Sequence, residues 1–186
     1  FPLCNGEKGI YHGRMISRLP MVNIVDIKGG FAANAVPDKA EAWVKAESLE
    51  SAGRVETVRE GELWHLTASG VGGHASLPEG TVNAIGMLVD YILANNVAAP
   101  EERRFLELVS LLNNDYTGAA LSVAADDGLF EPLTIVGGVI GVEDGQLVQS
   151  IDSRYPTNMS GSKIARAIQR AAGEAAEVTI DRDAEP

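Results

Sequence analysis

The sequence contains two glycine turns, and each lies between runs in which apolar and polar residues alternate. The first turn, Glu60-Gly61, lies within RVETVREGELWHLTASG, and the second, Glu143-Asp144-Gly145, lies within LTIVGGVIGVEDGQLVQSIDSRYP. Two β-type runs joined by a short glycine turn are typical of a β-hairpin. We therefore expect a hairpin in each half of the chain and a sheet that is mostly antiparallel.

Three further strands are expected from alternation and β-type composition. They cover residues 9–19, residues 22–30, which end in a glycine pair, and residues 177–183 near the end of the chain. In the second of these runs, Val22, Ile24 and Ile27 alternate with polar residues, which favours a strand with one buried face.

Helices are expected in four segments: 39–53, 78–96, 101–114 and 160–174. Asp38 and Ser160 stand where helix N-caps belong, and Pro78 and Pro100 mark helix starts. The segment 115–132 is ambiguous, and we interpret it as a short helix followed by a loop. Together these elements predict an α+β fold of two ferredoxin-like subdomains, whose mostly antiparallel sheet carries helices on one face. Possible subdomains are 1–96 and 97–186.

Charge and composition exclude several classes of partner. The 15 basic and 26 acidic residues give a formal net charge of −11, which repels a phosphate backbone, so we expect no nucleic acid. No apolar stretch approaches the roughly 20 residues that span a bilayer, so we expect no membrane association. The single cysteine, Cys4, cannot form an internal disulfide and favours a reducing, cytoplasmic location. The chain has no initiator Met, and we expect it to be one domain of a longer protein.

The chain has three histidines, and none has a second ligand at metal-binding spacing. We therefore expect this chain to hold no metal. His12 and His65 lie in predicted strands, where a structural histidine is the better interpretation. His74 differs, because it follows Gly72-Gly73 in the loop VGGHASLPEG, where small neighbours leave the imidazole accessible. From the residues alone it could equally cap a helix.

Two further candidates can bind a carboxylate. Asn34 lies in the loop GGFAANAVPDKA, and its amide can donate a hydrogen bond without bringing charge, although an asparagine in a loop usually bonds its own backbone. Arg154 ends the strand before Tyr155-Pro156, and its planar fork suits a carboxylate. It could also simply pair with Asp152 on the surface.

Taken together and in order, GGFAANAVPDKAEA, GGHASLPEGTVNAIG and IDSRYPT resemble the lid domain of PepV-type zinc dipeptidases. These enzymes belong to the metallopeptidase superfamily that also contains aminoacylases and desuccinylases. The opening FPLCNGEKG resembles the point at which such chains leave the catalytic domain, and EVTIDRDAEP the point at which they re-enter it. The resemblance extends over essentially the whole chain, with little contribution from 97–132.

The resemblance implies a role for each candidate. His74 would stabilise the oxyanion of the tetrahedral intermediate, and Asn34 and Arg154 would hold the C-terminal carboxylate of a dipeptide substrate. The two zinc ions and the general-base glutamate would belong to a catalytic domain of the same polypeptide, with the glutamate before Phe1. The lid alone would then be inactive, and the parent enzyme is expected to be a monomer.

Two alternatives remain open from the sequence. The chain could be the lid of an N-acyl amino acid deacylase or desuccinylase. It could also be a stand-alone module that binds an amino acid or a peptide.

Overall fold

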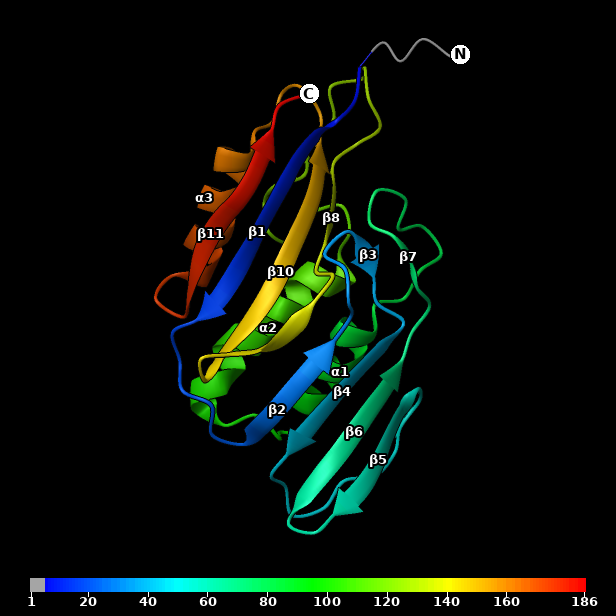
Figure 1. Cartoon of the computed structure of the whole chain (residues 1–186), viewed down its shortest axis with the longest axis vertical. Coiled ribbons are helices and arrows are strands. Elements are labelled where there is room, and N and C mark those ends of the chain that lie inside the picture. Colours follow the sequence, from blue (N-terminus) through cyan, green and yellow to red (C-terminus); the bar gives the residue numbers. More distant parts are fainter. Residues whose placement is uncertain (1–5) are drawn as a thin grey trace.

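A single large antiparallel sheet organises the molecule in the computed structural model, which describes residues 6–186. Cys4 and the first five residues of the expected junction lie outside the described residues. The strand order is β11-β1-β10-β9-β2-β4-β6-β5, and β8 pairs with β10 beside β9 (Figure 1). The strands are β1 (Gly9–Ser17), β2 (Ile24–Gly29), β4 (Lys39–Val44), β5 (Val55–Glu60), β6 (Leu63–Ser69), β8 (Thr134–Val136), β9 (Ile140–Glu143), β10 (Gln146–Tyr155) and β11 (Ala176–Ala184).

Both predicted hairpins are present. β5 and β6 pair from Glu60↔Leu63 onward, and β9 and β10 pair from Glu143↔Gln146 onward. At the second turn Asp144 and Gly145 both have positive φ, of 49° and 77°, as a two-residue hairpin turn requires. The strands expected at 9–19, 22–30 and 177–183 are also confirmed, as β1, β2 and β11.

The first described strand lies between two of the last. β1 pairs with β10 and with β11, so that Ile10 is opposite both Arg154 and Ala184. The two ends of the chain therefore leave the sheet at the same end, as Figure 1 shows. The proposed division into subdomains 1–96 and 97–186 stays a prediction. β1 belongs to the first of these segments but pairs with β10 and β11 of the second.

Helices cover one face of the sheet: α1 (Ala84–Ala94), α2 (Pro100–Asn114) and α3 (Gly161–Ala172) (Figure 1). Their apolar residues and the inward side chains of the strands form one continuous core, which contains Tyr11, Phe105 and Tyr155. The α+β class, with a mostly antiparallel sheet and helices on one face, is thereby confirmed. Within residues 6–186, no helix is both long enough and apolar enough to cross a bilayer.

The helix predicted over 39–53 is wrong, because residues 39–44 form strand β4. Ala40, Ala42 and Val44 are buried, whereas Lys39 and Glu41 point to the other face. This two-residue alternation buries one side of the segment between β2 and β6, and that burial outweighs the helix propensity of Ala, Glu and Lys.

The second predicted helix begins later than expected. Its N-cap is Asn83, whose side chain accepts a hydrogen bond from the amide of Ile85, and residues 78–83 form turns with Gly80 at φ 75°. The helices expected at 101–114 and 160–174 are confirmed as α2 and α3, and Ser160 caps α3 as predicted.

The short helix predicted within 115–132 is also wrong, because this segment is irregular. Asp115 and Asp127 instead bind backbone amides with their side chains, and such local bonds compete with a helix.

A buried polar network joins the helices to the centre of the sheet. The Asn83 amide donates to the side chain of Asn113 and to the carbonyl of Gly137, and Asn113 donates to Gln149. All three side chains are at most 2% exposed. The network therefore fixes the backbone at Gly137. The next residue, Gly138, lies against the loop that carries Asn34.

Candidate functional site

Asn34 and His74 meet through a short two-stranded ribbon. Strands β3 (Ala35–Val36) and β7 (Gly73–His74) pair antiparallel, with Ala35 opposite His74, and the amide of Ala75 donates to the carbonyl of Asn34. Both side chains are exposed. Two loops that are 40 residues apart in the sequence thus present their candidate residues next to one another.

Hydrogen bonds fix the imidazole of His74 in one orientation. The backbone N–H of Ser76 donates to Nδ1 at 3.2 Å, and the Ser76 hydroxyl lies 2.7 Å from the same atom. Because a backbone amide can only donate, Nδ1 is an acceptor, and the neutral imidazole carries its proton on Nε2. The exposed ring therefore offers an N–H donor, as an oxyanion would require. His74 holds the turn of its own loop and does not cap α1, whose N-cap is Asn83.

Glycine allows the Asn34 loop to lie close to the centre of the sheet. Gly30 directly follows β2 and has a positive φ of 69°. A Cβ on Gly30 would overlap the carbonyl oxygen of Gly138. A Cβ on Gly138 would in turn overlap the backbone of Ala32 and Ala33. Only glycine at both positions permits this approach, which places Asn34 directly beside the ribbon.

Arg154 is held by a buried carboxylate. Its Nε and Nη2 donate to the two oxygens of Asp152 at 3.1 and 3.2 Å, in a bidentate pair. The side chain of Asp152 is fully buried and that of Arg154 is 17% exposed. The expected Asp152 pairing is therefore present, but it lies within the structure and not on the surface. Nη1 makes no hydrogen bond within residues 6–186, so it remains free to bind a ligand.

His12 completes this cluster from the neighbouring strand. It lies opposite Asp152 in the β1–β10 register, and its Nε2 is 2.7 Å from Oδ2 of Asp152. The side chains of His12, Asp152 and Arg154 share the sheet face that the helices leave open, because alternate residues of a strand point to the same side. The structural role expected for His12 stays a prediction; its neighbour is the carboxylate that orients Arg154.

A cavity of about 360 Å³ joins Arg154 to the His74 loop. Its lining includes Arg154 together with Ser76, whose hydroxyl and amide contact His74. Arg154 is therefore linked to His74 through the cavity and Ser76, and Asn34 lies beside His74; the side chains of Asn34 and His74 do not themselves line the cavity.

Lys8 is the residue of this region that sequence analysis did not select. It lines the same cavity, and its Nζ donates to the carbonyl of Pro132 at 2.9 Å. Burial lowers the pKa of its ammonium group, the negative charge of Glu131 opposes that shift, and the positive charge of Arg154 adds to it. The segment NGEKG was noted for its resemblance to a domain junction, but nothing in it indicated that Lys8 would lie near Arg154.

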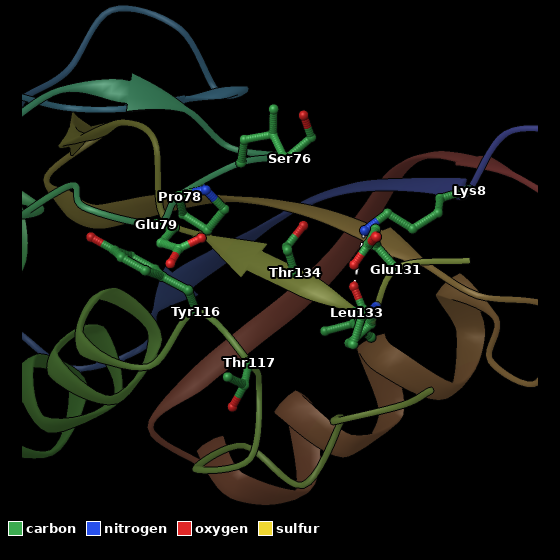
Figure 2. Close-up of a pocket in the computed structure, with 11 residues that line it drawn as sticks. Lys8, Ser76, Pro78, Glu79, Tyr116, Thr117, Glu131, Leu133 and Thr134 are labelled. Carbon is green, nitrogen blue, oxygen red and sulfur yellow. Dashed lines mark hydrogen bonds between the residues drawn. The ribbon is translucent and has the colours of Figure 1, made fainter. Parts of the chain in front are cut away.

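A second cavity, of about 420 Å³, adjoins the first (Figure 2). Lys8, Ser76 and Glu131 line both cavities. The remaining wall is mostly apolar and comes from segments distant in sequence, with Leu77 and Pro78 from the His74 loop and Tyr116 and Leu133 from later segments. This wall could not be read from the sequence, because the segment 115–132 has no regular pattern.

The described residues do not form a metal site. No group of three or more His, Cys, Asp or Glu side chains within 6–186 is arranged to hold an ion. His65 lies on the open sheet face, where its ring stacks on Trp43 with centroids 4.3 Å apart. Glu41 and Glu60 lie within 3.5 Å of its ring nitrogens.

Comparison with known proteins gives no family. No protein-family model matches the sequence, and no curated protein matches it.

Proposed function

We propose that this chain is the substrate-covering lid of a zinc-dependent dipeptidase. In this proposal Asn34 and Arg154 hold the C-terminal carboxylate of the dipeptide, and His74 donates a hydrogen bond to the oxyanion of the tetrahedral intermediate. The observation that carries the proposal is that Asn34 lies beside His74 at a pair of short strands, while Arg154 lines a cavity that Ser76, the hydrogen-bond partner of His74, also lines.

The state of His74 supports its role. A donor that stabilises an oxyanion must be held in place before the reaction and must present an N–H. Both bonds from Ser76 end at Nδ1, so the exposed Nε2 is the donor. The ring needs no reorganisation when charge develops opposite it.

The surroundings of Arg154 support the binding of a carboxylate. Asp152 fixes the guanidinium through two bonds, and Nη1 makes no hydrogen bond within residues 6–186. An oriented arginine loses little side-chain entropy when it binds, and it recognises a planar carboxylate by charge and geometry. Asn34 adds a neutral donor beside His74.

The metal belongs to a different part of the enzyme in this proposal. The described residues offer no ligand set, so we assign no metal-dependent step to them. Their contribution is to bind the substrate, to orient it and to stabilise charge. We also propose a cytoplasmic location, on the basis of the single cysteine.

Kinetics on the complete product of the gene test this proposal. We expect hydrolysis of free dipeptides. His74→Ala should lower kcat by about 100-fold or more with little change in KM, as loss of an oxyanion donor does. Arg154→Ala should mainly raise KM for substrates with a free carboxylate.

His65→Ala is the matched control, because His65 lies on the same open sheet face as Arg154, where it stacks on Trp43 and contacts two glutamates. It should leave kcat and KM unchanged. Equal activity of His74→Ala and wild type would refute the oxyanion role. Hydrolysis of N-acyl amino acids without hydrolysis of dipeptides would indicate a deacylase lid, and tight dipeptide binding without any turnover would indicate a binding module.

A further inference from the structure

The two cavities beside the His74 loop share one boundary, and a cation lies on it. Lys8 lines both of them, as do Ser76 and Glu131. Arg154, whose Nη1 makes no hydrogen bond within residues 6–186, lines the smaller cavity, and Leu77, Tyr116 and Leu133 line the larger one. Figure 2 shows Lys8, Tyr116 and Leu133 around the larger cavity. A ligand that spans the boundary would meet positive charge first and apolar surface next.

We infer that these cavities form a two-part subsite for the C-terminal residue of the substrate, in which Lys8 and Arg154 bind the carboxylate and the larger cavity accepts an aliphatic or aromatic side chain. This inference rests on the proposed function. It adds Lys8 as a binding residue and names the substrate class as dipeptides that end in an apolar residue.

The charges and hydrogen bonds of the site fit a carboxylate beside Lys8. An ammonium group has three donors, and the carbonyl of Pro132 takes one of them. Burial and the positive charge of Arg154 lower the pKa of the Lys8 ammonium group, and the negative charge of Glu131 raises it. Two cations that destabilise one another gain from an anion placed between them.

The wall of the larger cavity determines the side chain. Leu77 is 76% exposed, and Leu133, a core residue, lines the same cavity. Covering an exposed leucine with an apolar ligand removes apolar surface from water on both partners. Glu79 is an exposed carboxylate that lines the larger cavity and not the smaller one, so it disfavours an acidic side chain there by repulsion.

Direct binding to the chain provides the test without any turnover. The ¹⁵N-labelled protein is titrated with N-acetyl-L-leucine, which carries the amide, side chain and carboxylate of a C-terminal residue. We expect a saturable change in the amide signals of Ser76, Leu133 and Thr134, with a dissociation constant on the order of millimolar for so small a ligand. N-acetyl-L-leucinamide lacks the carboxylate and N-acetylglycine lacks the side chain, and each should bind about tenfold more weakly.

Variants assign the two parts separately. Lys8→Met keeps the stem and removes the charge, and it should weaken N-acetyl-L-leucine about tenfold. Leu77→Ser should weaken N-acetyl-L-leucine and leave N-acetylglycine unchanged. Lys163→Met is the control, because Lys163 is bonded to the carbonyl of Asn158 at the start of α3.

Equal binding of the acid and the amide would overturn the carboxylate part, and equal binding of the leucine and glycine ligands would overturn the side-chain part. Signal changes confined to other regions would overturn both. Failure of the proposed function shows itself differently, as absence of dipeptide hydrolysis by the complete gene product. Dipeptide hydrolysis that does not distinguish Gly-Leu from Gly-Gly would refute the subsite and leave the lid function standing.

Discussion

At the scale of single residues, the ion pair of Asp152 and Arg154 is where structure and proposed chemistry meet. A buried carboxylate without its partner is an uncompensated charge, and the same holds in part for the guanidinium. The pair therefore orients a binding group and also couples that group to the stability of β10.

Asp152→Ala should lower the free energy of unfolding by about 3–5 kcal/mol, because it leaves the Arg154 guanidinium partly buried and unpaired. Urea denaturation measures this. The exposed pair of Arg14 and Glu143 provides the control, since Glu143→Ala at a surface pair should cost less than about 1 kcal/mol. Equal costs for the two variants would show that burial does not determine the strength of the Asp152 pair.

The sequence indicated part of the site at this scale. Asn34, His74 and Arg154 could be selected because their residue types suit a carboxylate or an oxyanion and because they lie in glycine-flanked loops or at a strand end. Lys8 could not be selected, since its proximity to Arg154 depends on the pairing of β1 with β10 across more than 130 residues. The register of two distant strands is not contained in local pattern.

At the scale of elements, Glu102 controls how α2 begins. Its side chain is 1% exposed, one oxygen accepts from the amides of Val22, Asn23 and Ile24, and the other accepts from Ala99 at the helix N-cap. A single carboxylate thus satisfies amides at the start of both β2 and α2.

Glu102→Gln should lower the free energy of unfolding by about 2–3 kcal/mol, because an amide group places N–H donors against backbone N–H donors. Thermal or urea denaturation gives the value. Glu101→Gln is the matched control, since Glu101 is exposed on the same first turn and should change stability by less than about 0.5 kcal/mol. A Glu102→Gln protein as stable as Glu101→Gln would contradict this account.

The irregular segment between α2 and β8 should loosen in acid. Burial raises the pKa of Asp115, but hydrogen bonds from Ala120 and Thr117 outweigh it and leave the pKa below its ordinary value. Hydrogen bonds from Thr157 and Phe130 hold the pKa of Asp127 well below its ordinary value. A depressed folded-state pKa stabilises the fold above the unfolded value, and this stabilisation is lost as pH falls through the folded value.

Amide exchange of residues 117–130 should therefore be slow above about pH 4, the ordinary range of an aspartate, and become faster as the pH drops further. Hydrogen–deuterium exchange, corrected for the intrinsic pH dependence, measures this. Asp127→Asn should show the faster exchange already at neutral pH. Exchange that rises with increasing pH after the correction would contradict the assignment.

Local sequence pattern predicted most elements and failed where tertiary contacts decide. Both hairpins and α3 carry their own signals, in Gly61, Gly145 and Ser160. β4 carries a misleading signal, since Ala, Glu and Lys favour a helix in isolation, and only its position between β2 and β6 makes it a strand. α1 begins after its N-cap Asn83 and not at Pro78. The side chain of Asn83 is held at this position by its hydrogen bonds to Asn113 and Gly137.

At the scale of the whole molecule, the sheet is narrowest where β9 meets β2. The two strands pair only at Gly29↔Ile140, so the halves of the sheet are joined mainly through the core and the network of Asn83, Asn113 and Gln149. Whether the halves unfold together therefore depends on side chains more than on the backbone ladder.

We expect one cooperative transition, because the core is continuous across both halves. Trp43 and Trp64, the only tryptophans, lie in β4 and β6, so their fluorescence reports on one half while circular dichroism reports on the whole. The two denaturation curves should coincide. Asn113→Ala should shift both by the same amount, about 2–3 kcal/mol, since it removes the buried hydrogen bonds that Asn113 makes with Asn83 and Gln149. Curves that separate in the wild type would show two independent units.

The position of β1 has a consequence for folding of the chain during its synthesis on the ribosome. β1 is synthesised well before both of its neighbours, β10 and β11, which lie more than 120 residues later in the chain. At ordinary translation speeds the strand waits roughly 10 to 30 seconds, with its hydrogen-bonding edges open, before either partner emerges. During that interval it is a site for chaperones and for pairing with neighbouring nascent chains, so slower synthesis of the last strands should lower the yield of folded protein.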